Sequence, residues 1–480
     1  MKECRKPESE NRNMSDSRNI VTGVFVAAAV VLSVMAYAFY PKAASSGMEE
    51  QVNKPLFKFD PEKVRSLAIV KFDSDRNSFD ELVMDNHVVN GWSIPSKFGY
   101  PVDSAEKLVL TASSLAGLVV LGIASEDPTD EETYGVVEPK PGLKAGQKGV
   151  GTRVTLKNRE KQDIASIIIG KEVKDRPGQR FVRVPEQRFI YVCEYDPSVL
   201  TTDFFEWINP RILDFGTQWS VRNLSLDKYG ATKTALLEVN PSYRADLLLD
   251  QSKWTTLAYV DSADAKASPS LDVAELERVR LAIENFEIQD VARKSRAMAL
   301  SLQQRNGIPN TFQVLGDLQR IGFFLDEMVS PAREMGAGGE LAFTSTVGIR
   351  YRMLFGNLLA SEATGRANDQ RYVMVSADVD PDFFPIPAKP QSGGGTPEKK
   401  NDAPVPPGGG NCGEATNQDD DREARRQYQI KLEERKNRIE LTRNAADQIN
   451  KRFSDWFYVI DNELYRRLMP DKGAIVSKNQ

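Results

Sequence analysis

A run of 21 residues without a charged side chain, Ile20–Tyr40, constrains this chain more than any other feature. At about 1.5 Å per residue, a helix of this length spans roughly 30 Å, the thickness of the hydrocarbon core of a bilayer. Tyr37 and Tyr40 stand near its end, where aromatic side chains favour the membrane interface. The run predicts one transmembrane helix that anchors a large polar body at a membrane surface.

The flanking charges predict the side of the membrane on which the body lies. Residues 1–19 hold five Lys and Arg residues, whereas residues 41–59 hold three. Because cytoplasmic flanks carry the excess of Lys and Arg, we expect a cytoplasmic N-terminus at 1–19 and an extracytoplasmic body. Translation from Met14 would reduce the number of Lys and Arg residues on the N-terminal flank and so narrow the difference between the two flanks. The alternative to a retained helix is cleavage of a signal peptide after Ala38.

The residue types that most enzymes need are scarce. The 480 residues include one histidine, His87, and three cysteines, Cys4, Cys193 and Cys412. Serine and cysteine hydrolases need a histidine base, and zinc sites usually need several imidazole or thiolate ligands. We therefore expect no catalytic residue, no metal site and no cofactor, and the net charge of −5 favours no nucleic-acid partner. A disulfide between Cys193 and Cys412 stays an open alternative.

The body contains a weak internal repeat. Five short segments recur in the same order, with an offset that only grows along the chain, from 157 to 191 residues. Chance matches would scatter, so the pattern predicts two copies of one unit, with insertions in the second. The matched pairs are Val64–Ile69 with Val221–Leu226, Gly91–Trp92 with Lys253–Trp254, Val102–Glu106 with Leu271–Glu275, Ile167–Gly170 with Arg352–Gly356, and Arg180–Val184 with Arg371–Val375.

Each unit is expected to combine an antiparallel sheet with one principal helix. In the first unit the helix follows Asp103 or Ser104 and runs to about Leu118. Its predicted buried face is formed by apolar residues at helical spacing: Leu108, Ala112, Leu115 and Val119. Strands are expected at 64–72, 80–89, 153–156, 164–169, 181–184 and 189–193, with Trp92 and Trp254 as core residues.

The second unit is interrupted near its end. Residues 385–420 are rich in Pro and Gly, which predicts a disordered linker. Residues 421–453 are predicted to form a charged amphipathic helix, in which Glu434 and Arg438 make an i,i+4 pair. This helix either packs its apolar stripe on the domain or binds a partner. The stripe repeats every seven residues, as in a coiled coil, at Leu432, Ile439, Ala446 and Phe453.

The predicted fold class is therefore α+β. A transmembrane helix precedes two related units of mainly antiparallel sheet, each with one main helix, and a long charged helix lies near the C-terminus. The predicted domains are the N-terminus at 1–19, the membrane helix at 20–40, a stalk at 41–56, the first repeat unit at 57–205, the second at 212–384 and 454–470, the linker at 385–420 and the inserted helix at 421–453.

Several of these features together resemble a known family. They are the anchor, the strand end at Trp92 before Pro95, the helix start at 103–106, the Tyr134-Gly135 pair before Pro139, and the Ile-Gly strand before a hairpin. The set is similar to the bacterial family called domain of unknown function 4340, over roughly 57–205 and more loosely over 212–470. The resemblance implies a single-pass envelope protein, often found beside ABC transporters of the gliding-motility type. It implies no catalytic residues.

Other short motifs each lack a part that the corresponding site needs. The Ser104–Lys107 motif has the Ser-x-x-Lys spacing of penicillin-binding enzymes without their other two elements, so we expect a helix start. The remaining motifs are interpreted as polar turns, a flexible loop, a helix start and a packed or surface histidine: Asp73–Asn77, Asp378–Asp382, Gly146–Gly151, Asp419–Asp421 and His87.

Three functions compete at this point. The first is a non-catalytic accessory or interaction component of a transporter or envelope complex in the bacterial inner membrane. It would bind the bilayer through Ile20–Tyr40 and also bind a protein partner, such as an ABC transporter. The alternative is an extracytoplasmic protein that binds a small ligand in a cleft between the two repeats. An enzyme that uses carboxylates alone is the third and least favoured.

Overall fold

The computed structural model describes residues 51–74, 76–88, 91–143, 146–213, 221–251, 253–264, 269–360, 369–390 and 414–477. The chain divides into two compact units, Met1–Val83 with Glu106–Thr202 and Met84–Ala105 with Asp203–Gln480. The predicted membrane segment Ile20–Tyr40 lies outside the described residues. Within the described ranges, no helix is both long enough and apolar enough to cross a membrane.

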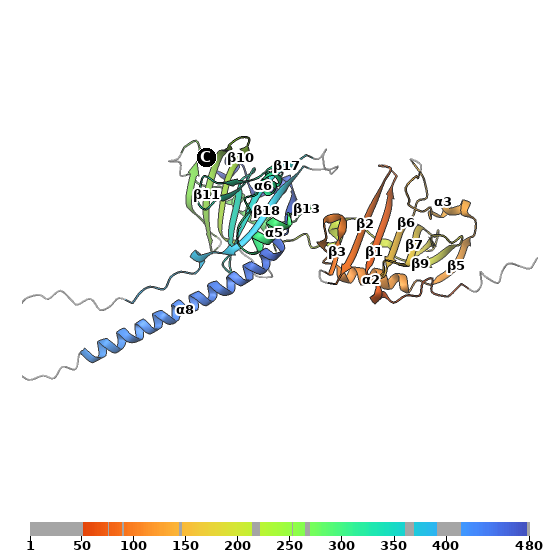
Figure 1. Ribbon diagram of the computed structural model, residues 1–480, viewed down its shortest axis with the longest axis horizontal. Helices are drawn as coiled ribbons and strands as arrows, with labels where there is room; N and C mark the ends of the chain where they lie inside the picture. Colours follow the sequence, from red (N-terminus) through yellow and green to blue (C-terminus); the bar gives the residue numbers. More distant parts are fainter. Residues whose placement is uncertain are drawn as a thin grey trace, which may run out of the picture. The chain divides into compact units, whose positions relative to one another are not determined.

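A nine-stranded sheet forms the first part of the body, coloured orange to yellow in Figure 1. Leu67 and Ile69 alternate with more exposed neighbours along β1 and are buried, as a strand with one covered face requires. The strand order is β4-β3-β2-β1-β6-β7-β8-β9-β5, and the pairs whose register is defined are antiparallel. The strands are β1 (Ser66–Asp73), β2 (Ser78–His87), β3 (Gly91–Ile94), β4 (Tyr100–Pro101), β5 (Val120–Ser125), β6 (Thr152–Lys157), β7 (Asp163–Glu172), β8 (Gln179–Arg183) and β9 (Ile190–Glu194).

Helix α2 (Ala105–Ala116) runs along one side of this sheet (Figure 1). Leu108, Ala112 and Leu115 are buried, as the helical spacing predicts. Val119 is 38% exposed, because the helix ends at Ala116 and the backbone then turns into β5. The shorter elements of this part are η2 (Pro61–Lys63), η3 (Pro95–Lys97), η4 (Pro128–Asp130), α3 (Glu131–Tyr134) and η5 (Pro197–Val199).

An eight-stranded sheet forms the second part, coloured green to blue in Figure 1. Its order is β12-β11-β10-β16-β17-β18-β19-β13, and its strand pairs are antiparallel. A separate two-stranded hairpin, β14–β15, stands beside it. The strands are β10 (Val221–Lys233), β11 (Leu237–Asp250), β12 (Lys253–Asp261), β13 (Asp290–Arg293), β14 (Phe323–Asp326), β15 (Arg333–Gly336), β16 (Glu340–Ser345), β17 (Ile349–Leu359), β18 (Gln370–Val379) and β19 (Trp456–Asp461).

The helices of the second part begin at polar caps. The Asp272 carboxylate accepts hydrogen bonds from the N–H groups of Ala274 and Glu275 at the start of α4, and α4 packs against α9. Ser295 and Thr311 accept hydrogen bonds in the same way at the starts of α5 and α6. The helices are η6 (Phe204–Trp207), α4 (Val273–Glu284), α5 (Arg296–Gln303), α6 (Phe312–Arg320), η7 (Pro381–Phe383), α8 (Glu414–Phe453), α9 (Asn462–Leu468) and α10 (Lys472–Ile475).

The two sheets share one strand order once the edge strand β4 is set aside. Reading across each sheet, β3-β2-β1-β6-β7-β8-β9-β5 corresponds position by position to β12-β11-β10-β16-β17-β18-β19-β13. Helix α2 precedes β5 just as α4 precedes β13. All five matched segment pairs of the sequence lie on corresponding strands or at the starts of corresponding helices.

The prediction of antiparallel sheets combined with helices is confirmed. Three boundaries differ from the sequence prediction. Residues 84–105 group with the second unit rather than with the predicted unit 57–205. Residues 53–56, expected in a stalk, bond to the backbone of residues 118–120 before and at the start of β5, which gives that edge hydrogen-bond partners. Helix α8 begins at Glu414, inside the predicted linker 385–420, where the acidic run at 419–421 favours N-terminal helical turns.

Equivalent core substitutions should weaken the two sheets separately. Leu67 and Leu224 stand at matched positions of β1 and β10, and each is 1% exposed. We expect Leu67→Ala and Leu224→Ala each to lower the free energy of unfolding of its own sheet by about 2–5 kcal/mol. Hydrogen exchange resolved by peptide measures both effects in one experiment. Faster exchange spread equally over both sheets in either variant would contradict this expectation.

Candidate functional site

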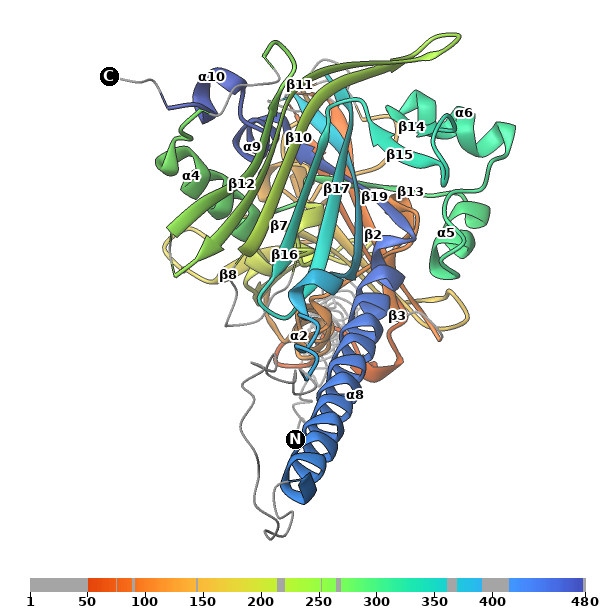
Figure 2. The same cartoon turned by 90° about the vertical axis from the view of Figure 1, so that its left-hand side faces the viewer.

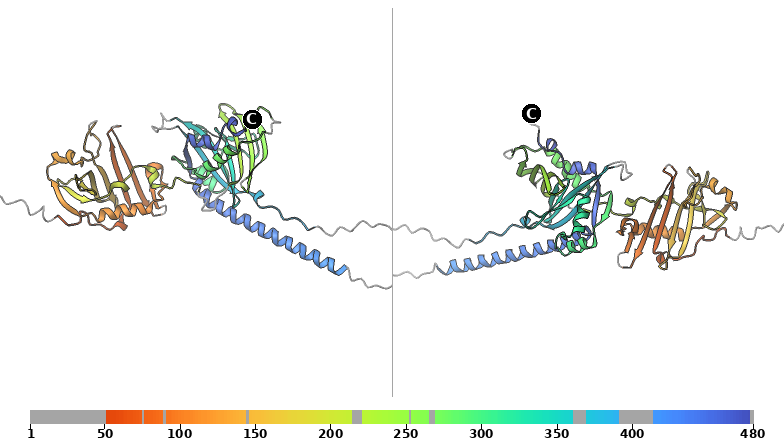
Figure 3. Two further views of the ribbon diagram at one scale, coloured as in Figure 1. Left: turned by 180° about the vertical axis from the view of Figure 1, so that it is seen from behind. Right: turned by 45° about the horizontal axis from the view of Figure 1, so that its top comes forward.

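Helix α8 is seated at one end and exposed at the other. Ala446 and Phe453 are buried, Leu432 and Ile439 are half-buried, and residues 422–427 are exposed. Figures 2 and 3 show the helix leaving the second sheet and extending away from it. The seven-residue stripe therefore packs on the domain only toward its C-terminal end.

The C-terminal end of α8 packs on β17, β18, β19 and α5. We call this contact surface the seat of α8. Asn450 pairs with the backbone of β18 in both directions. Its amide nitrogen donates to the carbonyl of Ala377 at 2.6 Å, and its amide oxygen accepts from the N–H of Ala377 at 2.9 Å. The Asn450 amide makes the two hydrogen bonds that a neighbouring strand would make, so it fixes the position of α8 along β18.

Farther along α8, arginine side chains hold the chain that leaves η7. The Arg435 guanidinium donates to the carbonyl of Phe384 at 2.7 Å, and Arg438 lies over the Phe384 ring at 5.2 Å. The predicted pair between Glu434 and Arg438 is therefore wrong, because the aromatic ring offers Arg438 a partly buried surface that an exposed ion pair lacks.

Lys294 provides hydrogen bonds at the C-terminal end of α8. It follows β13 directly and is only 3% exposed. Its Nζ donates to the carbonyl of Phe453, the last residue of α8, at 2.6 Å and to the carbonyl of Trp456 at 2.7 Å. The C-terminal carbonyls of a helix have no partner within the helix, so a buried helix end needs donors of this kind.

Burial lowers the pKa of Lys294 to about 7, against the raising effects of the nearby Asp455 and Glu334 charges. The Phe453 carbonyl, which accepts one of its N–H groups, lies at the negative end of the dipole of α8, and this end favours the charged amine. Burial and the neighbouring charges therefore have opposite effects on the protonation of Lys294, a side chain that is itself only 3% exposed.

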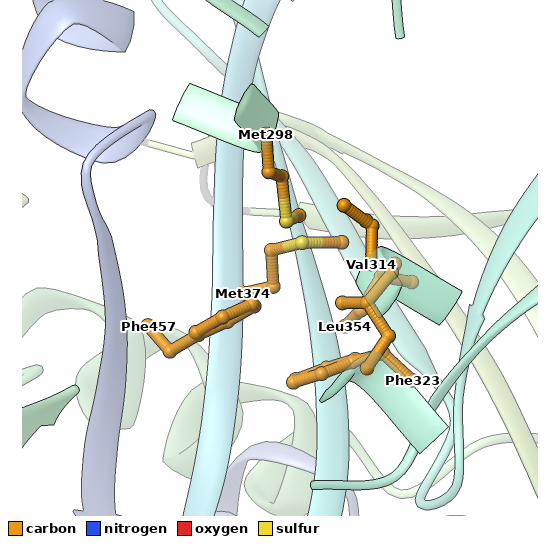
Figure 4. Packing of buried hydrophobic residues seen from close by; sticks show 7 residues of the cluster. Met298, Val314, Phe323, Leu354, Met374 and Phe457 are labelled. Carbon is orange, nitrogen blue, oxygen red and sulfur yellow. The ribbon is translucent and has the colours of Figure 1, made fainter. Parts of the chain in front are cut away.

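A cavity of ≈ 90 Å³ lies beside Lys294. It adjoins a wider polar groove between α5 and α8, since Leu302 and Asn450 line both. Arg305 and Asp447 form an ion pair across this groove. Leu354 and Met374, which line the cavity, belong to an apolar cluster whose side chains pack together in Figure 4. The buried members of this cluster are Met298, Val314, Leu318, Phe323, Leu354, Met374 and Phe457.

A charged network holds Glu334 at the wall of this cavity. Arg352 donates to a carboxylate oxygen and to the main-chain carbonyl of Glu334, at 2.8 and 2.7 Å, and it also binds Glu340. Burial raises the pKa of Glu340, but the hydrogen bonds and charges of Arg352 and Arg333 prevail and lower it. The Glu340 carboxylate therefore stays ionised at neutral pH, and the two hydrogen bonds from Arg352 hold Glu334 to β17.

The motifs singled out in the sequence have structural roles. Lys107 lies on the first turn of α2, and its carbonyl accepts from the Thr111 hydroxyl. Asp73 accepts from Arg76 in the turn after β1. Asp380 is 3% exposed, accepts from the Thr344 hydroxyl and from the N–H of Asp382, and so caps η7.

The isolated residues are equally separate from the seat of α8. His87 is exposed at the end of β2, and burial raises the pKa of the free Cys193 thiol to about 12. Trp254 is buried as predicted and donates to Glu277 at 2.7 Å, whereas Trp92 is only half-buried. Among the described residues, no three His, Cys, Asp or Glu side chains are close enough together to hold a metal ion.

The sequence analysis missed Lys294, Glu334 and Asn450. None of them carries a motif, and each contacts a segment distant in the chain: Glu334 contacts Arg352, 18 residues later, Asn450 contacts Ala377, 73 residues earlier, and Lys294 contacts Phe453, 159 residues later. The one available signal was the stripe ending at Phe453, which predicts that the last turn of α8 is buried and needs donors.

Comparison with known proteins gave one match. Residues 92–305 match the model of the family described as Domain of unknown function (DUF4340). The matched range runs from β3 to just past α5, so it includes Lys294 but not Glu334 or α8. It is narrower than the predicted range of resemblance. No match was found among curated proteins or among solved structures.

The pKa of Lys294 predicts how stability depends on pH. The unfolded lysine titrates near 10.4 and the folded one near 7, so the unfolded chain binds more protons between these values. We expect this residue alone to raise the free energy of unfolding by up to about 1.4 kcal/mol per pH unit from pH 7 to 10. Urea unfolding of wild type and Lys294→Met across this range measures the difference.

The control is Lys451→Met, which removes an exposed lysine from helix α8. It should keep the wild-type dependence on pH. Parallel curves for wild type and Lys294→Met would mean that Lys294 is no harder to charge in the folded protein than in the unfolded chain.

Proposed function

From the match of residues 92–305 to the DUF4340 family, we propose that this chain is a non-catalytic, membrane-anchored envelope protein. It serves as an accessory or interaction component of a transporter or envelope complex. The observation that carries this proposal is helix α8, whose 40 residues are held at one end and exposed at the other. A helix of this length is roughly 60 Å long, which is enough to reach a partner well outside the domain.

The proposed anchor is the uncharged segment Ile20–Tyr40, with the N-terminus in the cytoplasm and the body outside the inner membrane. The described chain begins at residue 51, only ten residues after this segment. A ten-residue connection reaches at most about 35 Å, so it would keep the body close to the bilayer.

We further infer that the two sheets are copies of one unit. Their common strand order and the five matched segments support this inference. The second copy differs by two insertions, α5 to β15 and the segment that ends in α8. The proposed partner contact is on the second insertion, which extends beyond the sheet.

The exposed part of α8 offers an outer face of mixed chemistry. Ile430 and Leu441 are 41% and 70% exposed, and their spacing of three turns places them on one side of the helix. They alternate along that side with polar and charged residues, as at the rim of a protein interface. The alternative function, a ligand cleft between the two repeats, stays a prediction, since the cavity described above lies inside the second unit alone.

The anchor has a direct test. Full-length protein expressed in a bacterium should remain with the membrane after an alkaline carbonate wash and dissolve in detergent, because the apolar segment prefers lipid to water. A variant lacking residues 20–40 should appear in the soluble fraction. External protease added to spheroplasts should digest the body of the wild type. Recovery of intact wild-type protein in the soluble fraction would overturn the anchor.

The partner contact is tested on the outer face of α8. We expect Ile430→Asp with Leu441→Asp to abolish crosslinking in the membrane to a transporter subunit identified by mass spectrometry. The melting temperature should stay unchanged, since neither side chain packs on the domain. The control is Leu236→Asp, an equally exposed apolar residue at the tip of the β10–β11 hairpin. Equal crosslinking in all three proteins would remove α8 as the contact.

A further inference from the structure

In its charged form, Lys294 carries one N–H group more than the carbonyl groups of the described residues accept. A lysine ammonium carries three N–H groups. The carbonyls of Phe453 and Trp456 accept two of them, and the Nζ also lies 5.0 Å from the centre of the Phe457 ring. These are the partners that the described residues give the amine. Lys294 also lines the cavity of ≈ 90 Å³, so an acceptor for the third N–H has space there.

A carboxylate of opposite charge lines the same cavity. One oxygen of Glu334 accepts from Arg352, and its other oxygen is available to a second donor. The charge of Glu334 raises the pKa of Lys294, although the two side chains form no direct ion pair. The cavity therefore presents a cation and an anion to whatever fills it.

The remaining walls and the size limit the occupant. Leu302, Leu354, Met374 and Phe453 form apolar walls, and the hydroxyl groups of Ser376 and Ser454 stand among them. The volume of ≈ 90 Å³ limits the occupant to a small molecule. The adjoining groove between α5 and α8 is polar and offers a route for a hydrophilic solute.

We propose that this cavity binds a small α-amino acid, with its carboxylate on the Nζ of Lys294 and its ammonium group on the carboxylate of Glu334. A simple anion would meet repulsion from Glu334, and a simple cation would meet repulsion from Lys294. When Lys294 is protonated, a zwitterion offers each of the two groups a charge of opposite sign, so no charge in the filled cavity stays unpaired. The apolar walls accept at most a methyl-sized side chain, so the inferred ligands are glycine and alanine.

Binding should be coupled to proton uptake. At pH 8, about a tenth of Lys294 is protonated in the empty site, given its pKa of about 7. Asp455 and Glu334 are the charged groups that act on it, and a ligand carboxylate adds a third negative charge. We expect up to about 0.9 proton to be taken up for each ligand bound at pH 8.

The experiment is calorimetric titration of the full chain in detergent with glycine at pH 8, in phosphate and in Tris. The difference in heat between the two buffers gives the number of protons taken up. Acetate and methylammonium, which each carry half of the zwitterion, should bind at least about tenfold more weakly than glycine. This arm needs no variant, so it tests the proposal even if substitutions in the seat impair folding.

Three variants then assign the groups. Lys294→Met should lose at least about tenfold in glycine affinity together with the proton uptake. Glu334→Gln should lower the affinity for glycine to about the affinity for acetate. Lys451→Met, at the rim of the groove, should bind glycine with the wild-type affinity. The proposal is overturned if wild type gives no heat with glycine, which would leave only water in the cavity. Binding without proton uptake, or unchanged affinity in Lys294→Met, would overturn it equally.

Discussion

A buried helix end has to find donors for its last carbonyl groups, and the second unit is organised around that requirement. Lys294 donates one N–H group to the last carbonyl of α8 and one to the first carbonyl of β19, and Asn450 pairs with the backbone of β18 one turn earlier. A buried carbonyl left without a partner costs about 1–3 kcal/mol, which is a large share of the stability of a domain. Because α8 touches the domain only toward this end, these few contacts decide where its exposed residues point.

The contacts join the two insertions that distinguish the second sheet from the first. In the first sheet, β5 connects to β6 through η4, α3 and a loop, and β8 connects to β9 through a short turn. In the second, α5, α6 and the β14–β15 hairpin stand between β13 and β16, and α8 stands between β18 and β19. Lys294 is the first residue of the first insertion, and Asn450 lies near the C-terminal end of the second. The cavity and the groove lie where the two insertions meet, on a sheet whose strand order is unchanged.

Much of the scaffold was predictable from the sequence because it depends on local patterns. Leu108, Ala112 and Leu115 follow helical spacing, and the five repeated segments keep their order, so local spacing and repetition suffice to place strands and the main helices. The site could not be found in this way. Lys294 lies in the sequence Asp-Val-Ala-Arg-Lys-Ser, where Arg293 and Lys294 look alike, and only the packing of α8, some 160 residues later, buries one of them. Such burial is a long-range property with no local signal. The prediction of a Glu434–Arg438 pair failed for the same reason, since Phe384 comes from 54 residues earlier in the chain.

One side chain thus belongs to both the cavity and the seat of α8, and this has an energetic consequence. Protonated Lys294 is the stronger donor to the Phe453 carbonyl and complements the negative end of the helix dipole. A negatively charged group at its third N–H favours the protonated form, so filling the cavity strengthens the seat. Linkage requires the reverse effect to be equal: whatever holds α8 more firmly raises the affinity of the cavity for its occupant by the same factor. On the two proposals made above, a partner that holds α8 more firmly and a solute in the cavity would be coupled through a single amine.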